Sequence, residues 1–137
     1  MIRRLDERTL VAGQIAPGDV AALAARGVTL IVNNRPDGET PDQPAGADIA
    51  AAARAAGLDY RHIPVAGAIA AEQVAAMAAA LEEAEGPLLA FCRSGTRSAF
   101  LWALAQTQRG ADAESLIAQA AAAGYDLSPL RPSPARR

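Results

Sequence analysis

The sequence predicts an α/β fold, a three-layer sandwich with a mainly parallel central sheet of about four to five short strands. One pattern recurs along the chain: an alanine-rich helix, a glycine, a short apolar strand and a loop. Repeated strand–helix units of this kind place their strands in parallel, with helices on both faces of the sheet. At 137 residues, the chain has the length of one domain with a core of its own.

The first half of the chain begins with a short apolar strand at residues 9–12. Pro17 suits the first turn of a helix, and Gly27 has the position of the glycine that ends it. Residues 28–33 are rich in β-branched and aliphatic side chains, which predicts a buried strand. Proline and glycine are too frequent in residues 34–46 for a helix or strand, so this segment is predicted to be a long loop.

The second half continues the same alternation. Glycines at 57, 110 and 124 follow three of its helices in the C-cap position. The predicted helices cover residues 47–56, 71–83, about 98–109 and 113–123, and the predicted strands cover residues 58–63 and 88–91.

The whole arrangement is expected to be one domain, residues 1–127, followed by a flexible tail at 128–137 that is rich in proline and arginine. In a parallel sheet the loops after the carboxyl ends of the strands share one rim, and ligands bind there. The loops after Asn33, Ile63 and Phe91 are therefore expected to face one another.

Composition excludes several classes of function. The thirteen basic residues are all arginine and are scattered, and the net charge is −2, which argues against a nucleic-acid surface. No stretch has the length and apolar character of a membrane span or a signal peptide, so a cytoplasmic protein without membrane contact is expected. With one cysteine and one histidine, we expect no disulfide, no metal site and no cofactor.

The candidate active site is the loop that follows the strand at residues 88–91. The apolar run stops at Cys92, four small or polar residues separate it from Arg97, and a helical pattern begins at about Ser98. Backbone amides of such a loop, together with those of the first helical turn, converge on one small hollow suited to an anion. These dipoles and the nearby guanidinium group favour a thiolate, which makes Cys92 the candidate nucleophile. A cation at a helix N-terminus is unfavourable without an anion, so Arg97 is assigned to anion binding as well.

The loop Cys92-Arg93-Ser94-Gly95-Thr96-Arg97-Ser98 resembles the active loop of rhodanese-type sulfurtransferases, in which four residues separate the cysteine from the arginine. The related loop of cysteine-dependent phosphatases has five intervening residues. By this resemblance, Arg93, Ser94, Gly95 and Thr96 form the anion-binding part of the loop.

Other segments resemble the phosphatase-like domain of beta-lactamase hydrolase-like proteins, a family also described as sulfur transferases. They are Gly13-Gln14, Asn34-Arg35-Pro36-Asp37-Gly38-Glu39, His62-Ile63-Pro64-Val65, the active loop and Gly124-Tyr125-Asp126-Leu127. The resemblance extends to about Leu130 and implies a fold similar to that of dual-specificity phosphatases. It also implies that Arg35 binds the anion and that Asp37 and Glu39 reach the rim. His62 lies inside a strand, which favours a structural role, but imidazole titrates near neutral pH and the residue stays a candidate.

Sulfur transfer is the leading hypothesis from the sequence. Cys92 would attack the outer sulfur of a small anionic donor, and the loop amides and Arg97 would hold the resulting persulfide. A thiol or cyanide acceptor would then remove the sulfur. Ser98 is assigned a hydrogen bond to the cysteine sulfur, and Arg93 is assigned to guiding anionic donors. The family resemblance also makes a persulfide-handling hydrolase a plausible partner.

A phosphatase acting through a cysteinyl-phosphate is the alternative, and a non-catalytic anion or persulfide sensor is the third. Phosphoester cleavage benefits from a carboxylic acid that protonates the leaving oxygen. In dual-specificity phosphatases this acid lies just after the proline that ends the third strand, and the matching positions here hold Val65, Ala66, Gly67 and Ala68. Asp37, Glu39 or Glu72 would have to replace it in a phosphatase.

Overall fold

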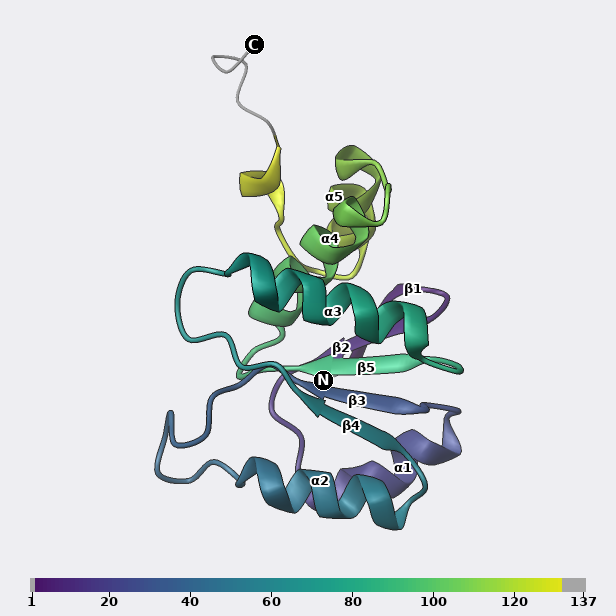
Figure 1. The fold of residues 1–137 in the computed structure, drawn as a ribbon, viewed down its shortest axis with the longest axis vertical. Coiled ribbons are helices and arrows are strands. Elements are labelled where there is room, and N and C mark those ends of the chain that lie inside the picture. The colour runs from purple at the N-terminus through teal and green to yellow at the C-terminus, as the bar shows by residue number, and fades with distance from the viewer. Residues whose placement is uncertain (1, 132–137) are drawn as a thin grey trace.

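A computed structural model describes residues 2–131, in which a five-stranded sheet lies between two layers of helices (Figure 1). The strands are β1 (Ile2–Asp6), β2 (Thr9–Ala12), β3 (Leu30–Asn33), β4 (Asp59–His62) and β5 (Leu88–Phe91). The α-helices are α1 (Val20–Ala25), α2 (Gly46–Ala55), α3 (Ala71–Glu83), α4 (Thr96–Gln108) and α5 (Ala113–Ala122). The predicted α/β fold with a mainly parallel sheet is confirmed.

The strand order is β1-β2-β5-β3-β4. The last four strands in this order, β2, β5, β3 and β4, pair in parallel. β1 pairs antiparallel with β2 at the edge of the sheet. β1 is not predicted from the sequence, because Arg3 and Arg4 at its centre are exposed and an edge strand of this kind has no continuous apolar run.

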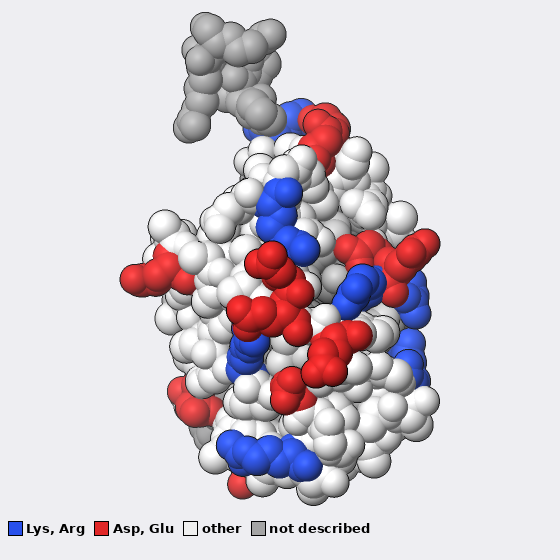
Figure 2. Space-filling view, turned by 45° about the vertical axis from the view of Figure 1, so that its right-hand side comes forward, with Lys and Arg blue, Asp and Glu red and all other residues white. Residues whose placement is uncertain are grey.

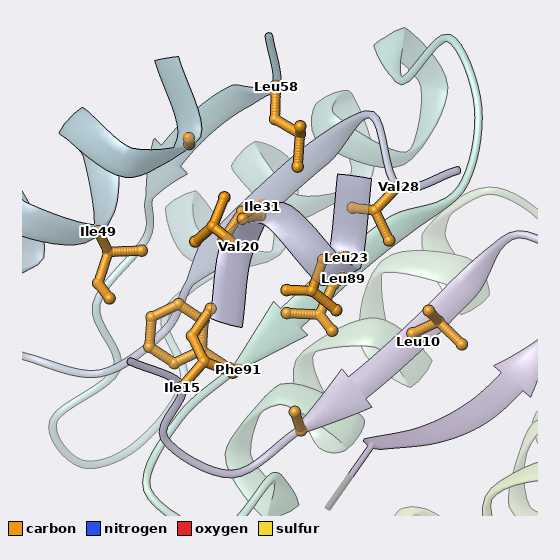
Figure 3. Packing of buried hydrophobic residues seen from close by; sticks show 12 residues of the cluster. Leu10, Ile15, Val20, Leu23, Val28, Ile31, Ile49, Leu58, Leu89 and Phe91 are labelled. Atoms are coloured by element: carbon orange, nitrogen blue, oxygen red, sulfur yellow. The ribbon is translucent and has the colours of Figure 1, made fainter. Parts of the chain in front are cut away.

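Three hydrophobic clusters fill the space between the layers. The central strands send alternate side chains to opposite faces of the sheet, as the strand period of two requires. Ile31, Leu89 and Phe91 enter the cluster under α1 and α2, which Figure 3 shows from close by. Leu30 and Val32 enter the cluster under α3 and α4. A third cluster packs α4 and α5 against β2, on the face of that strand turned away from α1 and α2.

Two further segments differ from the expected structure. The helix predicted from Pro17 begins as a 3-10 turn, Pro17–Asp19, and becomes α-helical only at Val20. Part of the predicted flexible tail is folded: Ser128–Leu130 forms a 3-10 helix, and Arg131 is ion-paired with Glu114 of α5. Residues 132–137 of that tail lie outside the described residues.

The helices described in residues 2–131 all lack either the length or the apolar character needed to cross a membrane. On the face shown in Figure 2, acidic side chains gather in one group and arginines lie beside and between them. The described residues therefore form no continuous basic stripe on that face.

Candidate active site

The cysteine loop leaves the carboxyl end of β5 and is held by the residues at the end of the neighbouring strand β2. The Cys92 amide donates to the Ala12 carbonyl at 3.3 Å, and the Gln14 amide donates to the Arg93 carbonyl at 3.2 Å. Gly13 passes so close to the loop that a β-carbon there would lie 2.9 Å from the Arg93 carbonyl oxygen. The end of β2 thus fixes the first half of the loop.

Gly95 forms the turn that directs the loop into α4. It is the N-cap residue of that helix, and its φ of 97° lies in the left-handed region that glycine adopts without strain. Its amide donates to the Cys92 sulfur at 3.1 Å. A β-carbon at Gly95 would overlap the Tyr125 hydroxyl, which packs directly against the loop. Burial, followed by the nearby Cys92, raises the pKa of Tyr125, so this hydroxyl keeps its proton.

Five amide hydrogens of the loop and the first turn of α4 donate to no acceptor among residues 2–131. They belong to Arg93, Ser94, Thr96, Arg97 and Ser98. Amides at the start of a helix have no partner within the helix, and here they are continuous with the loop that carries the cysteine. The described structure therefore has a row of donors available to an anion beside the Cys92 sulfur.

Arg97 is held in place by Glu39. Its two terminal nitrogens donate to the two oxygens of the Glu39 carboxylate at 2.7 and 2.8 Å, and Nη1 also donates to the Val65 carbonyl at 2.7 Å. A guanidinium group has five N–H donors, so Nε–H and one N–H of Nη2, on the same edge, have no acceptor within residues 2–131. Two parallel donors of this kind suit two oxygens of an oxyanion. Cys92 lies close enough to contribute to the raised pKa of Arg97, after the larger effect of Glu39.

Glu39 also bonds Arg35, so one carboxylate joins two guanidinium groups. The hydrogen bond from Arg97, followed by that from Arg35, lowers the pKa of Glu39 from 4.5 to about 2. A carboxylate with this pKa is ionised at neutral pH and cannot protonate a leaving group. Glu39 therefore positions Arg97 and does not replace the missing general acid.

The other two candidates for a general acid, Asp37 and Glu72, form no hydrogen bond or ion pair with the cysteine loop or Arg97 among the described residues. Asp37 accepts a hydrogen bond from the Gly46 amide at 2.8 Å, at the start of α2. Glu72 is exposed in the first turn of α3.

The exposed His62 places Nε2 2.9 Å from the Arg35 carbonyl oxygen. Because a carbonyl only accepts, this nitrogen donates. His62 thus holds the main chain of the loop that carries Glu39.

Ser98 differs from its expected role. Its hydroxyl is fully buried and donates to Oδ1 of Asn34 at 2.7 Å, so its single proton is not directed at the Cys92 sulfur in this structure. The Asn34 side chain in turn donates to the Ile63 carbonyl at 2.9 Å. Ser98 therefore ties the first turn of α4 to the ends of β3 and β4.

Replacing Ser98 with alanine is expected to lower the free energy of unfolding by about 1–3 kcal/mol, because Asn34 would keep a buried oxygen without a donor. Urea denaturation of the purified variant measures the loss. Ser115→Ala is the control, since this serine is exposed on α5 and should change stability by less than about 0.5 kcal/mol. A Ser98→Ala protein as stable as the wild type would contradict the structural role.

Replacing Glu39 with glutamine is expected to lower kcat/KM about tenfold, because Arg97 would lose a charged, bidentate partner. Stability provides a second measurement. The pKa of Glu39 is depressed in the folded state, so its contribution is present above about 4.5 and is lost as the pH falls towards 2. The stability difference between wild type and variant, followed by urea denaturation, should shrink over this window.

Glu114→Gln is the matched control because Glu114 pairs with Arg131 on the surface, where solvent screens such pairs and they contribute little to stability. It should leave turnover unchanged. A Glu39→Gln protein with full activity would remove Glu39 from the site.

Three residues that shape the site had no assigned role in the sequence analysis: Gln14, Asn34 and Tyr125. Each lies within two residues of the end of a predicted element, in a segment quoted for the family resemblance. Their position at the ends of predicted elements could have marked these three residues as site candidates. It could not show which side chains or main-chain groups they contact. Gln14 accepts a hydrogen bond from Arg35 at 3.0 Å, which links the end of β2 to the Glu39 loop.

The family model for the phosphatase-like domain of beta-lactamase hydrolase-like proteins matches residues 1–110. The beta-lactamase hydrolase-like protein of Agrobacterium fabrum is 43% identical over 108 residues, which are 78% of this chain and 25% of that protein. A Xylella fastidiosa protein of the same name is 38% identical over 125 residues, 90% of this chain and 29% of that protein. This chain therefore spans less than a third of these relatives.

Solved structures give the same fold. A proposed phosphatase of Neisseria meningitidis is 34% identical with a TM-score of 0.81, covering 93% of this chain and 92% of that one. TpbA of P. aeruginosa, solved in complex with phosphotyrosine, is 19% identical with a TM-score of 0.64, covering 86% and 70%. At that identity the likeness concerns the fold alone. The expected cysteine-phosphatase-like fold is confirmed, whereas the rhodanese likeness of the loop stays a prediction.

Proposed function

Because the chain belongs to the family of phosphatase-like domains of beta-lactamase hydrolase-like proteins, we propose that it is a cysteine-dependent phosphatase acting on phosphate monoesters. The observation that carries this proposal is the set of unused donors around Cys92. Five amide hydrogens and the Nε–H edge of Arg97 suit the three non-bridging oxygens of a phosphoryl group. The similarity to the Neisseria meningitidis protein supports the same choice. The sequence analysis placed this reaction second.

In the proposed reaction, the Cys92 thiolate attacks phosphorus and a sulfur–phosphorus bond forms. The phosphorus–oxygen bond breaks, and its electron pair leaves with the ester oxygen. Loop amides and Arg97 hold the phosphoryl oxygens through this transfer. Water then attacks the cysteinyl-phosphate, which releases inorganic phosphate and restores the thiolate. No metal or cofactor takes part in these steps.

The state of Glu39 gives this phosphatase a kinetic signature. Since Glu39 is ionised and Asp37 is bonded to the α2 backbone, neither of these carboxyl groups is placed to protonate the leaving oxygen, which departs without a proton from a carboxylic acid. We expect kcat for aryl phosphates to fall as the pKa of the leaving phenol rises. We also expect no decline of kcat between pH 6 and 8 of the kind that deprotonation of a general acid causes. A flat dependence on the leaving group would show that an unrecognised acid is present.

Sulfur transfer is the second candidate, and the same carboxylate favours it. A sulfur donor such as thiosulfate releases sulfite as an anion and needs no general acid. Cys92 would attack the outer sulfur, the sulfur–sulfur bond of the donor would break, and a thiol or cyanide would take the sulfur from the persulfide. The spacing of four residues between Cys92 and Arg97 supports this candidate as well. A persulfide-handling hydrolase as partner and a cytoplasmic location stay predictions.

One experiment separates the candidates. Reduced protein and its Cys92→Ser variant are assayed for aryl phosphate hydrolysis and for cyanide-dependent turnover of thiosulfate or glutathione persulfide. Cys92-dependent phosphate release with negligible thiocyanate supports the phosphatase. The reverse result overturns it in favour of sulfur transfer. Anion binding without turnover of either substrate class would instead support the third hypothesis, a sensor.

A further inference from the structure

A second hollow opens beside the cysteine loop and is not used by the reaction described above. It has a volume of about 210 Å³ and lies between the loop and the segment after β3. Its polar lining comes from Gln14, Arg35, Thr40, Asp42, Gln43 and Arg93. Two of these residues are arginines, and one of them directly follows Cys92 in the chain.

Arg35 is a buried cation, and some of its N–H groups have no acceptor among the described residues. Only 4% of the residue is exposed. Three of its five N–H groups donate to Glu39, Gln14 and Thr40. The other two, one on each terminal nitrogen, meet no acceptor among residues 2–131. A buried guanidinium group that lines a hollow with unused donors is suited to an oxyanion.

Arg93 completes the cationic side of the hollow. Its carbonyl is fixed by the Gln14 amide, while its guanidinium group is exposed and forms no hydrogen bond with the residues described. Asp42 supplies the opposing charge. It accepts a hydrogen bond from Thr40 at 2.8 Å, and its pKa is lowered first by this bond and then by smaller effects that include the charges of Arg35 and Arg93.

We propose that this hollow is a second anion subsite, formed by Arg35 and Arg93, with the Asp42 carboxylate as the opposing charge in its lining. The substrate class that fits is a small phosphate monoester with a second oxyanion, such as a carboxylate, a few atoms from the phosphate. Its phosphate lies at Cys92, and its second anionic group lies at the arginines, where it competes with the charge of Asp42. This inference rests on the proposed phosphatase function and specifies its substrate.

The test compares phenyl phosphate with 3-carboxyphenyl phosphate and with 3-(2-carboxyethyl)phenyl phosphate, which places the carboxylate farther from the ester. The quantity measured is the ratio of kcat/KM for a carboxylated substrate to that for phenyl phosphate. Wild type is expected to favour at least one carboxylated substrate. Arg93→Gln should lower this ratio about tenfold, since a charge-assisted contact is lost. Asp42→Asn should raise it several-fold because the competing anion is removed.

Arg54→Gln is the matched control, because this exposed arginine lies in the last turn of α2 and should leave the ratio unchanged. Equal ratios of about one in wild type, Arg93→Gln and Asp42→Asn, with phosphate still released, would overturn the subsite and leave the proposed phosphatase in place.

Calorimetry on Cys92→Ser protein separates the two proposals when no substrate is turned over. The carboxylated phosphates should bind more tightly than phenyl phosphate, and adding Arg93→Gln should remove the difference. Absent turnover with this preference intact would contradict the reaction but keep the subsite. Equal binding of all three ligands would overturn the subsite regardless of the reaction.

Discussion

Replacing Cys92 with serine is expected to lower turnover of aryl phosphates by at least about 10³-fold, because a serine hydroxyl is far less readily ionised than a thiol. The sulfur is fully buried at the base of the loop and accepts the Gly95 amide. Serine fits the same space, so the fold and anion binding should persist. Initial rates of phosphate release measure the loss, and thermal unfolding checks the fold.

The anion-binding property provides the control for this variant. Cys92→Ser protein should still bind inorganic phosphate, whereas Cys92→Ser with Arg97→Ala should bind it much more weakly. A Cys92→Ser protein that keeps a tenth or more of the wild-type rate would show that the reaction does not pass through the cysteine.

Replacing Arg97 with lysine is expected to lower kcat by about 10²–10³-fold although the charge is kept. The arginine holds Glu39 with two nitrogens, and its other edge donates to no acceptor among the described residues, which leaves it available to two oxygens of the substrate. A lysine ammonium is a single point of charge and cannot serve Glu39 and the phosphoryl group in this way. Steady-state kinetics should show a larger effect on kcat than on KM, because charge on the phosphoryl oxygens must be held through the transition state.

Arg131→Lys is the matched control, since Arg131 also donates to both oxygens of a carboxylate, that of Glu114, but does so on the surface. It should leave both kinetic constants unchanged. An Arg97→Lys enzyme within a few-fold of wild type would mean that only the charge matters and that the free edge of the guanidinium group has no role.

Much of the fold follows from local signals in the sequence. The predicted helix at residues 71–83 has the limits of α3, and the strand at 88–91 has the limits of β5. Both are set by short-range causes: a capping interaction of Gln73 at the start of α3 and an apolar run that ends at Cys92. The family assignment, made from motifs in their order along the chain, is also confirmed.

Strand β1 marks the limit of those signals. Its pairing with β2 is set by backbone hydrogen bonds across a tight connection, and its side chains are partly exposed and charged. An edge strand of this kind needs little apolar pattern, because only one of its residues, Leu5, is buried. Sequence periodicity therefore could not identify it.

By itself, the sequence determined the α/β fold, the family and the position of Cys92 between a strand and a helix, because these depend on local patterns. Only the tertiary structure decided the partners of the side chains. Glu39 reaches Arg97 across 58 positions, and Ser98 reaches Asn34 across 64. Such pairs depend on how the loops after β3 and β4 lie over the end of the sheet. In that arrangement the ionised Glu39 carboxylate holds Arg97 through two hydrogen bonds. The Ser98 hydroxyl donates to Asn34 instead of to the sulfur.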